Sequence, residues 1–209
     1  MNAAKWISRL FRKRRKEVSA EQYMKQREKD PEYLRQKAER EKWLAEREAY
    51  LAEAEAPLLA DLASLGFPVE SAWSLSTKYA DYTRAIPLLI EHLHRPYPEA
   101  IVVGIVRSLA IKAARKTVWP VLVDEYRKTD PKRKWVKDGL AAALSEVVDR
   151  STLRQLIELA RDLSQGESRL LLLTGIRRSR QPEAKQAIEE LSTDPQLAKE
   201  IASWRRHRK

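Results

Sequence analysis

The stretch AIPLLIEHLHRPYP (residues 85–98), followed by IVRSLA (residues 105–110), decides the fold. It consists of an apolar run, a turn segment with two prolines, and a second apolar run with Gly104 just before it. Turn residues between two apolar runs of this length predict two short helices joined by a tight turn. The question is then whether the rest of the chain repeats this unit.

The unit recurs along the chain. A short pattern marks each unit: an apolar residue, then an acid, then a further non-polar residue two positions after the acid. It begins at Ile90, Val123, Ile157 and Ile188, at intervals of 33, 34 and 31 residues. Gly104, Gly139 and Gly175 interleave with this set at intervals of 35 and 36 residues, with turn signals in between. A mid-helix glycine costs about 1 kcal/mol relative to alanine, so three in register predict close helix approach. Repeated helix pairs bury their apolar faces only against neighbours, which predicts a stack.

Composition supports an all-α fold and excludes several classes of protein. The 209 residues are 43% hydrophobic and 34% charged, with 5 glycines and no cysteine. Disulfides, thiolate metal sites and cysteine nucleophiles are therefore excluded. No apolar run approaches the roughly 18–20 residues that span a bilayer, and no apolar stretch follows the basic N-terminus as in a secretory signal. We expect a cytoplasmic protein, with peripheral attachment at the inner membrane as an alternative.

The formal net charge of +11 is concentrated at the two ends. Residues 1–16 carry +7 and residues 204–209 carry +4, so the chain between them is balanced. This divides the chain into a basic amphipathic arm (1–16), a long charged helical segment (17–56), a repeat domain (57–203) and a basic C-terminal tail (204–209).

The charged segment is expected to be a long solvated helix. Ser19 to Gln22 has the form of a capping box, and Asp30-Pro31 offers a second helix start. Leucines recur every seven residues, at Leu44, Leu51, Leu58 and Leu65. The complementary core positions of a coiled coil are charged, however, at Glu41, Glu48 and Glu55. We therefore expect a helix that rests one stripe on the next domain, rather than a coiled coil.

The quoted unit resembles a HEAT repeat. That family shows a proline in the first helix, a proline-containing turn and an alanine–leucine ending of the second helix; Pro87, Pro120 and LAAAL (140–144) match these features. Arg95 replaces the turn aspartate, and Val102 stands where an arginine is usual. Residues 58–204 also resemble a bacterial family of HEAT-like proteins, through LGFPVESAWSL (65–75) and SRLLLL (168–173). The resemblance implies a right-handed α-solenoid of four to five helix pairs behind the long charged helix, and it implies no chemistry.

The candidates for catalysis are few. The three histidines are His92, His94 and His207, and two of them lie two positions apart, which turns their rings about 200° from each other on a helix. We therefore expect no metal site, and the scattered glycines offer no phosphate loop and no cofactor site.

The resemblance to HEAT-like proteins includes one class of enzyme. Some HEAT-like proteins are DNA glycosylases that remove alkylated bases, and their sites resemble a buried aspartate flanked by tryptophans. Asp124 follows Trp119, and Asp138 follows Trp135. Core aromatics and surface acids explain both pairs as well, so we expect a protein that is not an enzyme and has no small-molecule substrate.

Charge separates between the two sets of helices. The formal charges of the residues in the expected second helices sum to +9, and those in the expected first helices sum to −4. The resemblance implies that second helices line a concave face. This predicts a basic binding face made of Arg107, Lys132, Arg133, Lys134, Lys137, Arg169, Arg177, Arg178 and Arg180. The function expected is a scaffold that binds an acidic protein there; nucleic acid is the alternative ligand. A third interpretation is that some of these side chains cover helix ends or pair internally.

The N-terminal arm combines an apolar face with a basic cluster. Its apolar residues Trp6, Ile7, Leu10 and Phe11 fall on one side of a short helix, and the cluster that follows is Arg12, Lys13, Arg14, Arg15 and Lys16. This pattern suits docking at an anionic membrane surface, and the same cluster also suits nonspecific binding of nucleic acid. A basic tail whose apolar residues pack on the long helix is the third possibility.

Overall fold

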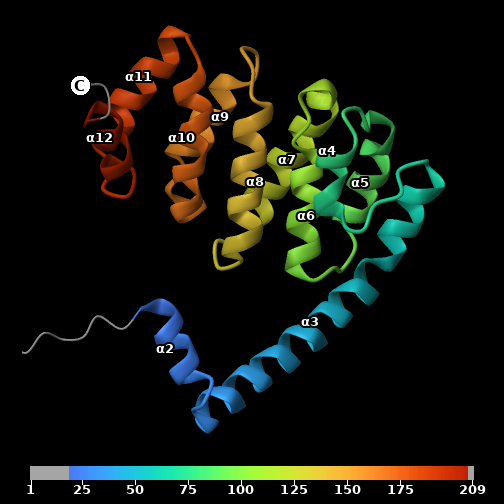
Figure 1. The fold of residues 1–209 in the computed structure, drawn as a ribbon. Coiled ribbons are helices and arrows are strands. Elements are labelled where there is room, and N and C mark those ends of the chain that lie inside the picture. Colours follow the sequence, from blue (N-terminus) through green and yellow to red (C-terminus); the bar gives the residue numbers. More distant parts are fainter. Residues whose placement is uncertain (1–18, 207–209) are drawn as a thin grey trace, which may run out of the picture. The chain divides into compact units, whose positions relative to one another are not determined.

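The structure is a computed structural model that describes residues 19–206. Within that range every regular element is a helix and none is a strand, as Figure 1 shows. The prediction of an all-α protein is thus confirmed for these residues. The chain divides into two compact units, Met1–Tyr50 and Leu51–Lys209.

The described part of the first unit holds α2 (Ala20–Arg27) and the beginning of α3 (Pro31–Ser64). The predicted capping box is present, because the Gln22 amide donates to Ser19 Oγ at 3.2 Å and the Ser19 amide donates to Gln22 Oε1 at 3.3 Å. The Glu32 amide donates to Asp30 Oδ1 at 3.0 Å and so caps α3. Side chains 31–50 are exposed apart from the half-buried Tyr33, as expected for a solvated helix.

The boundary between the units differs from the one that the sequence suggested. We placed it at Pro57, where apolar residues become denser, but α3 continues through Pro57 to Ser64. The buried residues of α3 are Glu55, Leu58 and Leu62. The helix therefore enters the core of the second unit without a break.

The second unit is built from short helices. After α3 they are η1 (Ala72–Ser74), α4 (Leu75–Lys78), η2 (Thr83–Ala85), α5 (Ile86–Leu93), α6 (Glu99–Leu109), η3 (Lys112–Ala114), α7 (Arg115–Lys128), α8 (Lys134–Val147), α9 (Leu153–Arg161), η4 (Leu163–Ser168), α10 (Arg169–Arg178), α11 (Pro182–Leu191) and α12 (Ala198–Arg206). The pairs α5/α6, α7/α8 and α9/α10 fall where the repeat predicted helix pairs.

Packing within the second unit follows chain order. α5 contacts α6, α7 contacts α8 and α9 contacts α10, while α6, α8 and α10 contact one another in succession (Figure 1). The apolar faces meet in one continuous core that includes Ile105, Leu140 and Leu172. Full burial of such a side chain contributes about 1.5–3 kcal/mol, so this shared core holds the helix pairs together.

The three repeated glycines are not equivalent. A Cβ on Gly175 would lie 2.8 Å from Leu156 Cδ2 and 3.0 Å from the Ser145 Cα of α8, which shows a close helix approach. A Cβ on Gly104 would lie 3.0 Å from the Trp73 ring. At Gly139 the nearest atom would be 3.5 Å away, an ordinary contact. The predicted close approach is therefore wrong at Gly139.

Candidate partner-binding groove

Two adjoining hollows follow the row formed by α6, α8 and α10. The first, here called the Trp73 hollow, has a volume of about 420 Å³; its lining includes Trp73, Val103, Arg107, Ala142 and Ala143. The second, called the Arg180 hollow, has a volume of about 400 Å³; its lining includes Lys112, Asp149, Arg150, Arg178 and Arg180. Glu146 lines both, so the two hollows meet at this residue, and together they are here called the groove.

Most residues that line the Trp73 hollow are apolar, and its aromatic wall is held in place. Trp73 Nε1 donates to the Ala100 carbonyl at 3.2 Å, and the ring packs on Gly104. The Arg107 guanidinium lies 5.6 Å from the centroid of the ring. With 43% of its surface exposed, Trp73 presents a fixed aromatic surface to the groove.

The floor of the Trp73 hollow is low because α8 carries small residues there. Gly139, Ala142 and Ala143 line it, and their side chains do not extend beyond Cβ. These residues belong to the segment of α8 whose other face supplies the buried leucines Leu140 and Leu144. The large residues on one face of this helix thus pack in the core, and the small residues on the other face leave space for the hollow.

At the junction of the hollows, Glu146 binds two basic side chains. Lys112 Nζ and Arg178 Nη1 each lie 2.8 Å from a Glu146 carboxylate oxygen. Hydrogen bonds from Lys112 and Arg178 lower the pKa of Glu146. Arg178 also donates to the Ser145 carbonyl near the end of α8. Two of the basic residues of the groove are therefore already occupied within the chain.

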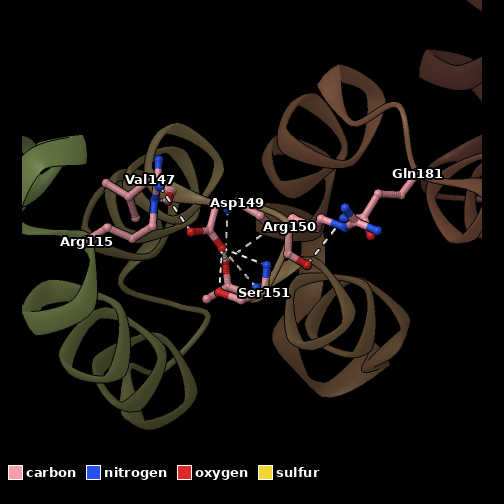
Figure 2. Close-up of polar contacts among 7 residues, drawn as sticks. Arg115, Val147, Asp149, Arg150, Ser151 and Gln181 are labelled. Carbon is pink, nitrogen blue, oxygen red and sulfur yellow. Dashed lines mark hydrogen bonds and ion pairs between the residues drawn. The ribbon is translucent and has the colours of Figure 1, made fainter.

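The turn before α9 carries Arg150, which lines the Arg180 hollow. Figure 2 shows the polar contacts that hold this turn. The amides of Ser151 and Thr152 donate to Asp149 Oδ1 at 2.9 and 3.1 Å, and Arg115 Nη1 lies 3.0 Å from Asp149 Oδ2. Hydrogen bonds from the Ser151 hydroxyl, from the amides of Ser151 and Thr152 and from the Thr152 hydroxyl lower the pKa of Asp149 to about 2. Gln181 Nε2 donates to the Arg150 carbonyl at 3.2 Å, which joins this turn to the one after α10.

Three arginines of the groove have no carboxylate partner among the residues that the structure describes: Arg107, Arg150 and Arg180. In total, five basic side chains and two carboxylates line the groove. The groove is therefore basic, and each hollow holds at least one arginine without a carboxylate partner among the described residues.

The structure separates the nine basic residues that the sequence grouped. Arg107, Arg178 and Arg180 line the groove. Lys132 and Lys134 line a different hollow of about 270 Å³ at the beginning of α8. Three of the others make contacts of their own: Lys134 pairs with Glu167, Arg133 with Glu99, and Arg177 stacks on Trp204.

Lys137 and Arg169 are wrongly predicted as binding residues, because each is only 1% exposed. Lys137 Nζ donates to the carbonyls of Tyr126 and Thr129 and, at 2.7 Å, to Gln165 Oε1. Arg169 donates to Asp194 Oδ2 at 2.7 Å and to Gln196 Oε1 at 2.6 Å. Both side chains therefore hold turns of the fold together and are unavailable to a partner.

A sequence signal for this role exists. Asp130, Asp162 and Asp194 recur every 32 residues, and each accepts a hydrogen bond from the amide two positions on. Lys137 and Arg169 follow the first two by seven residues, and each reaches forward to the next turn of the series. In contrast, Arg150 of the groove was missed because it lies in the turn between α8 and α9, outside the second helices. Lys112 lies in η3, within the stretch expected as a second helix, and was not singled out there.

The residues weighed for catalysis have ordinary structural surroundings. His92 is buried and lies between Asp61 Oδ2 at 3.0 Å and the Tyr97 hydroxyl at 2.7 Å. Asp124 is exposed and pairs with Lys128. Trp135 is 77% exposed beside Asp138, whose pKa is raised by burial. Neither acid is a buried aspartate between tryptophans, and no group of three or more potential ligands for a metal occurs among residues 19–206.

The arm stays a prediction, because residues 1–16 lie outside the described residues. Within the described part of the chain, no helix is both long and apolar enough to cross a membrane. Comparison of the chain with known protein families, with curated proteins and with solved structures finds no match.

Proposed function

We propose that residues 57–203 form a HEAT-type α-solenoid and act as a non-catalytic scaffold that binds an acidic protein segment in the groove. Two features support the solenoid. Consecutive helix pairs pack in chain order, and the turn series at Asp130, Asp162 and Asp194 repeats every 32 residues with a buried basic residue between turns. In such an array each repeat stabilises its neighbours, and the second helices are exposed along one face.

The observation that carries the proposed binding is the unpaired positive charge of the groove. Among residues 19–206, Arg107, Arg150 and Arg180 have no carboxylate partner, and all three line the groove. Exposed charge pairs contribute only about 0–1 kcal/mol each, so these arginines mainly select an acidic partner and speed its approach.

Polypeptide fits the groove better than duplex nucleic acid does. Each hollow is only about 400 Å³ in volume, and the floor of the Trp73 hollow is made of small apolar residues. A phosphate backbone gains nothing from an apolar floor, whereas side chains of a polypeptide do. The test therefore includes a nucleic acid probe, whose binding would favour the alternative ligand.

The test is fluorescence anisotropy with a labelled peptide of Asp, Glu and Ser, and with a random DNA duplex as the second probe. We expect R150E/R180E to weaken peptide binding about tenfold or more, because two attractive contacts become repulsive. K185E/K199E, which changes the same charge on exposed residues outside the groove, should stay within about twofold. Equal losses in the two variants, or binding of the duplex alone, would contradict the proposal.

A further inference from the structure

We infer that the segment bound in the groove carries an apolar anchor side chain beside its acids, and that Glu146 restrains its binding. The anchor occupies the Trp73 hollow, and the carboxylates of the segment pair with Arg150 and Arg180 in the Arg180 hollow. This inference rests on the proposed function, and it divides the groove into two parts with different chemistry.

The anchor is inferred from the walls of the Trp73 hollow. The hollow contains a fixed aromatic ring at Trp73 and apolar side chains at Val103, Ala110, Ala142 and Ala143. Fixed aromatic surfaces in apolar hollows are where interfaces concentrate their binding energy. An acidic segment without an apolar side chain leaves this surface wet, so the hollow favours a segment that fills it.

The binding site for the carboxylates of the segment is inferred from the basic side chains that have no carboxylate partner among the described residues. Arg150 and Arg180 have no carboxylate partner among the described residues, whereas Lys112 and Arg178 both bind Glu146 at 2.8 Å. A carboxylate of the partner that approaches Lys112 or Arg178 also meets the negative charge of Glu146. It is therefore directed to Arg150 and Arg180.

Glu146 consequently acts as a competitor built into the groove. It lines both hollows and neutralises two cations that an acidic segment would otherwise use. E146Q keeps the shape of the side chain and removes its charge, which leaves Lys112 and Arg178 unpaired. Loss of charge at this position should strengthen the binding of acidic segments, an unusual direction for a substitution in a binding site.

The experiment uses the full chain and two labelled peptides of Asp, Glu and Ser, one with a central leucine and one with serine in its place. We expect wild type to bind the leucine peptide about tenfold more tightly. W73L should reduce this preference, and A142F, which fills the hollow from an exposed position, should abolish it while serine-peptide binding stays unchanged. E146Q should bind both peptides about threefold to tenfold more tightly, whereas E158Q, a matched change outside the groove, should not.

Each outcome decides a separate claim. Equal binding of the two peptides by the wild type, or an unchanged preference in folded A142F, overturns the anchor. Unchanged or weaker peptide binding by E146Q overturns the role of Glu146. If neither wild type nor E146Q binds either peptide, the proposed function itself fails, and binding of a DNA duplex under those conditions would assign the groove to nucleic acid.

Discussion

Lys137 shows what a buried charge does in this fold. Its amine has three acceptors, of which two are backbone carbonyls that end the preceding helix and one is Gln165 of the next turn. K137M keeps the length of the side chain and leaves these acceptors unpaired. We expect the free energy of unfolding to fall by about 2–4 kcal/mol, measured by urea denaturation.

Lys134 provides the control for this substitution. It begins the same helix, is exposed, and forms only a surface ion pair with Glu167. K134M should cost no more than about 1 kcal/mol. If K137M is as stable as K134M, the buried lysine is not the link between turns that the geometry indicates.

Asp149 gives the fold a specific acid dependence. Its folded-state pKa of about 2 lies below the usual 3.8, so the unfolded chain binds more protons between these values and stability is lost as pH falls through them. Because the carboxylate is 32% exposed, we discount the full shift and expect about 1–2 kcal/mol. D149N should be less stable than wild type at neutral pH by this amount, and the difference should close near pH 2. A difference that stays constant across this range of pH would contradict the assignment.

At single residues, the sequence did not separate basic side chains that line the groove from basic side chains that are buried. Charge and helix position grouped Lys137 with Arg107, although one is buried and the other lines the groove. Charge alone does not distinguish these environments, since burial depends on acceptors supplied by a distant turn. Arg150 was missed because it lies in a turn, and the prediction considered only the helices.

At the scale of helices, the glycines allow a matched comparison. Replacing a mid-helix glycine with alanine stabilises a helix by about 0.5–1 kcal/mol when there is space for the methyl group. G139A has that space, with the nearest atom at 3.5 Å. G175A does not, because its Cβ would meet Leu156 and the backbone of Ser145 at 2.8 and 3.0 Å.

We therefore expect changes of opposite sign in the two variants. G139A should raise the free energy of unfolding by about 0.5 kcal/mol, and G175A should lower it by about 1–3 kcal/mol through overpacking. Urea midpoints measure both. A gain of stability in G175A would show that α8 and α10 move apart freely, and a loss in G139A would show that the methyl group has no space there.

Helix positions could be predicted because their signals are local. Turn residues such as Asp130-Pro131 predicted the ends of the paired helices to within a few residues. The capping box at Ser19 predicted the start of α2. The end of α3 could not be predicted this way. Pro57 indicated a boundary, but the burial of Leu58 and Leu62 in the second unit keeps the helix continuous.

At the scale of the whole molecule, the two units should differ in their share of the stability. Side chains 31–50 of α3 are exposed apart from Tyr33, and the buried residues of this helix begin at Glu55. Among the described residues, deletion of residues 1–50 removes no side chain of the core of the second unit. The remaining chain should unfold with a free energy within about 0.5 kcal/mol of the full chain, followed by far-UV circular dichroism in urea.

Extending the deletion to residue 64 provides the contrast. It removes Leu58 and Leu62, which are fully buried, together with the Glu55 carboxylate that accepts the Ala72 amide at 2.7 Å. The loss of two buried leucines alone amounts to about 3–6 kcal/mol, a large part of the 5–15 kcal/mol that stabilises a typical domain. A shorter deletion that is as damaging as the longer one would show that residues 1–50 contribute to the fold of the second unit, and the division at Tyr50 would have to be abandoned.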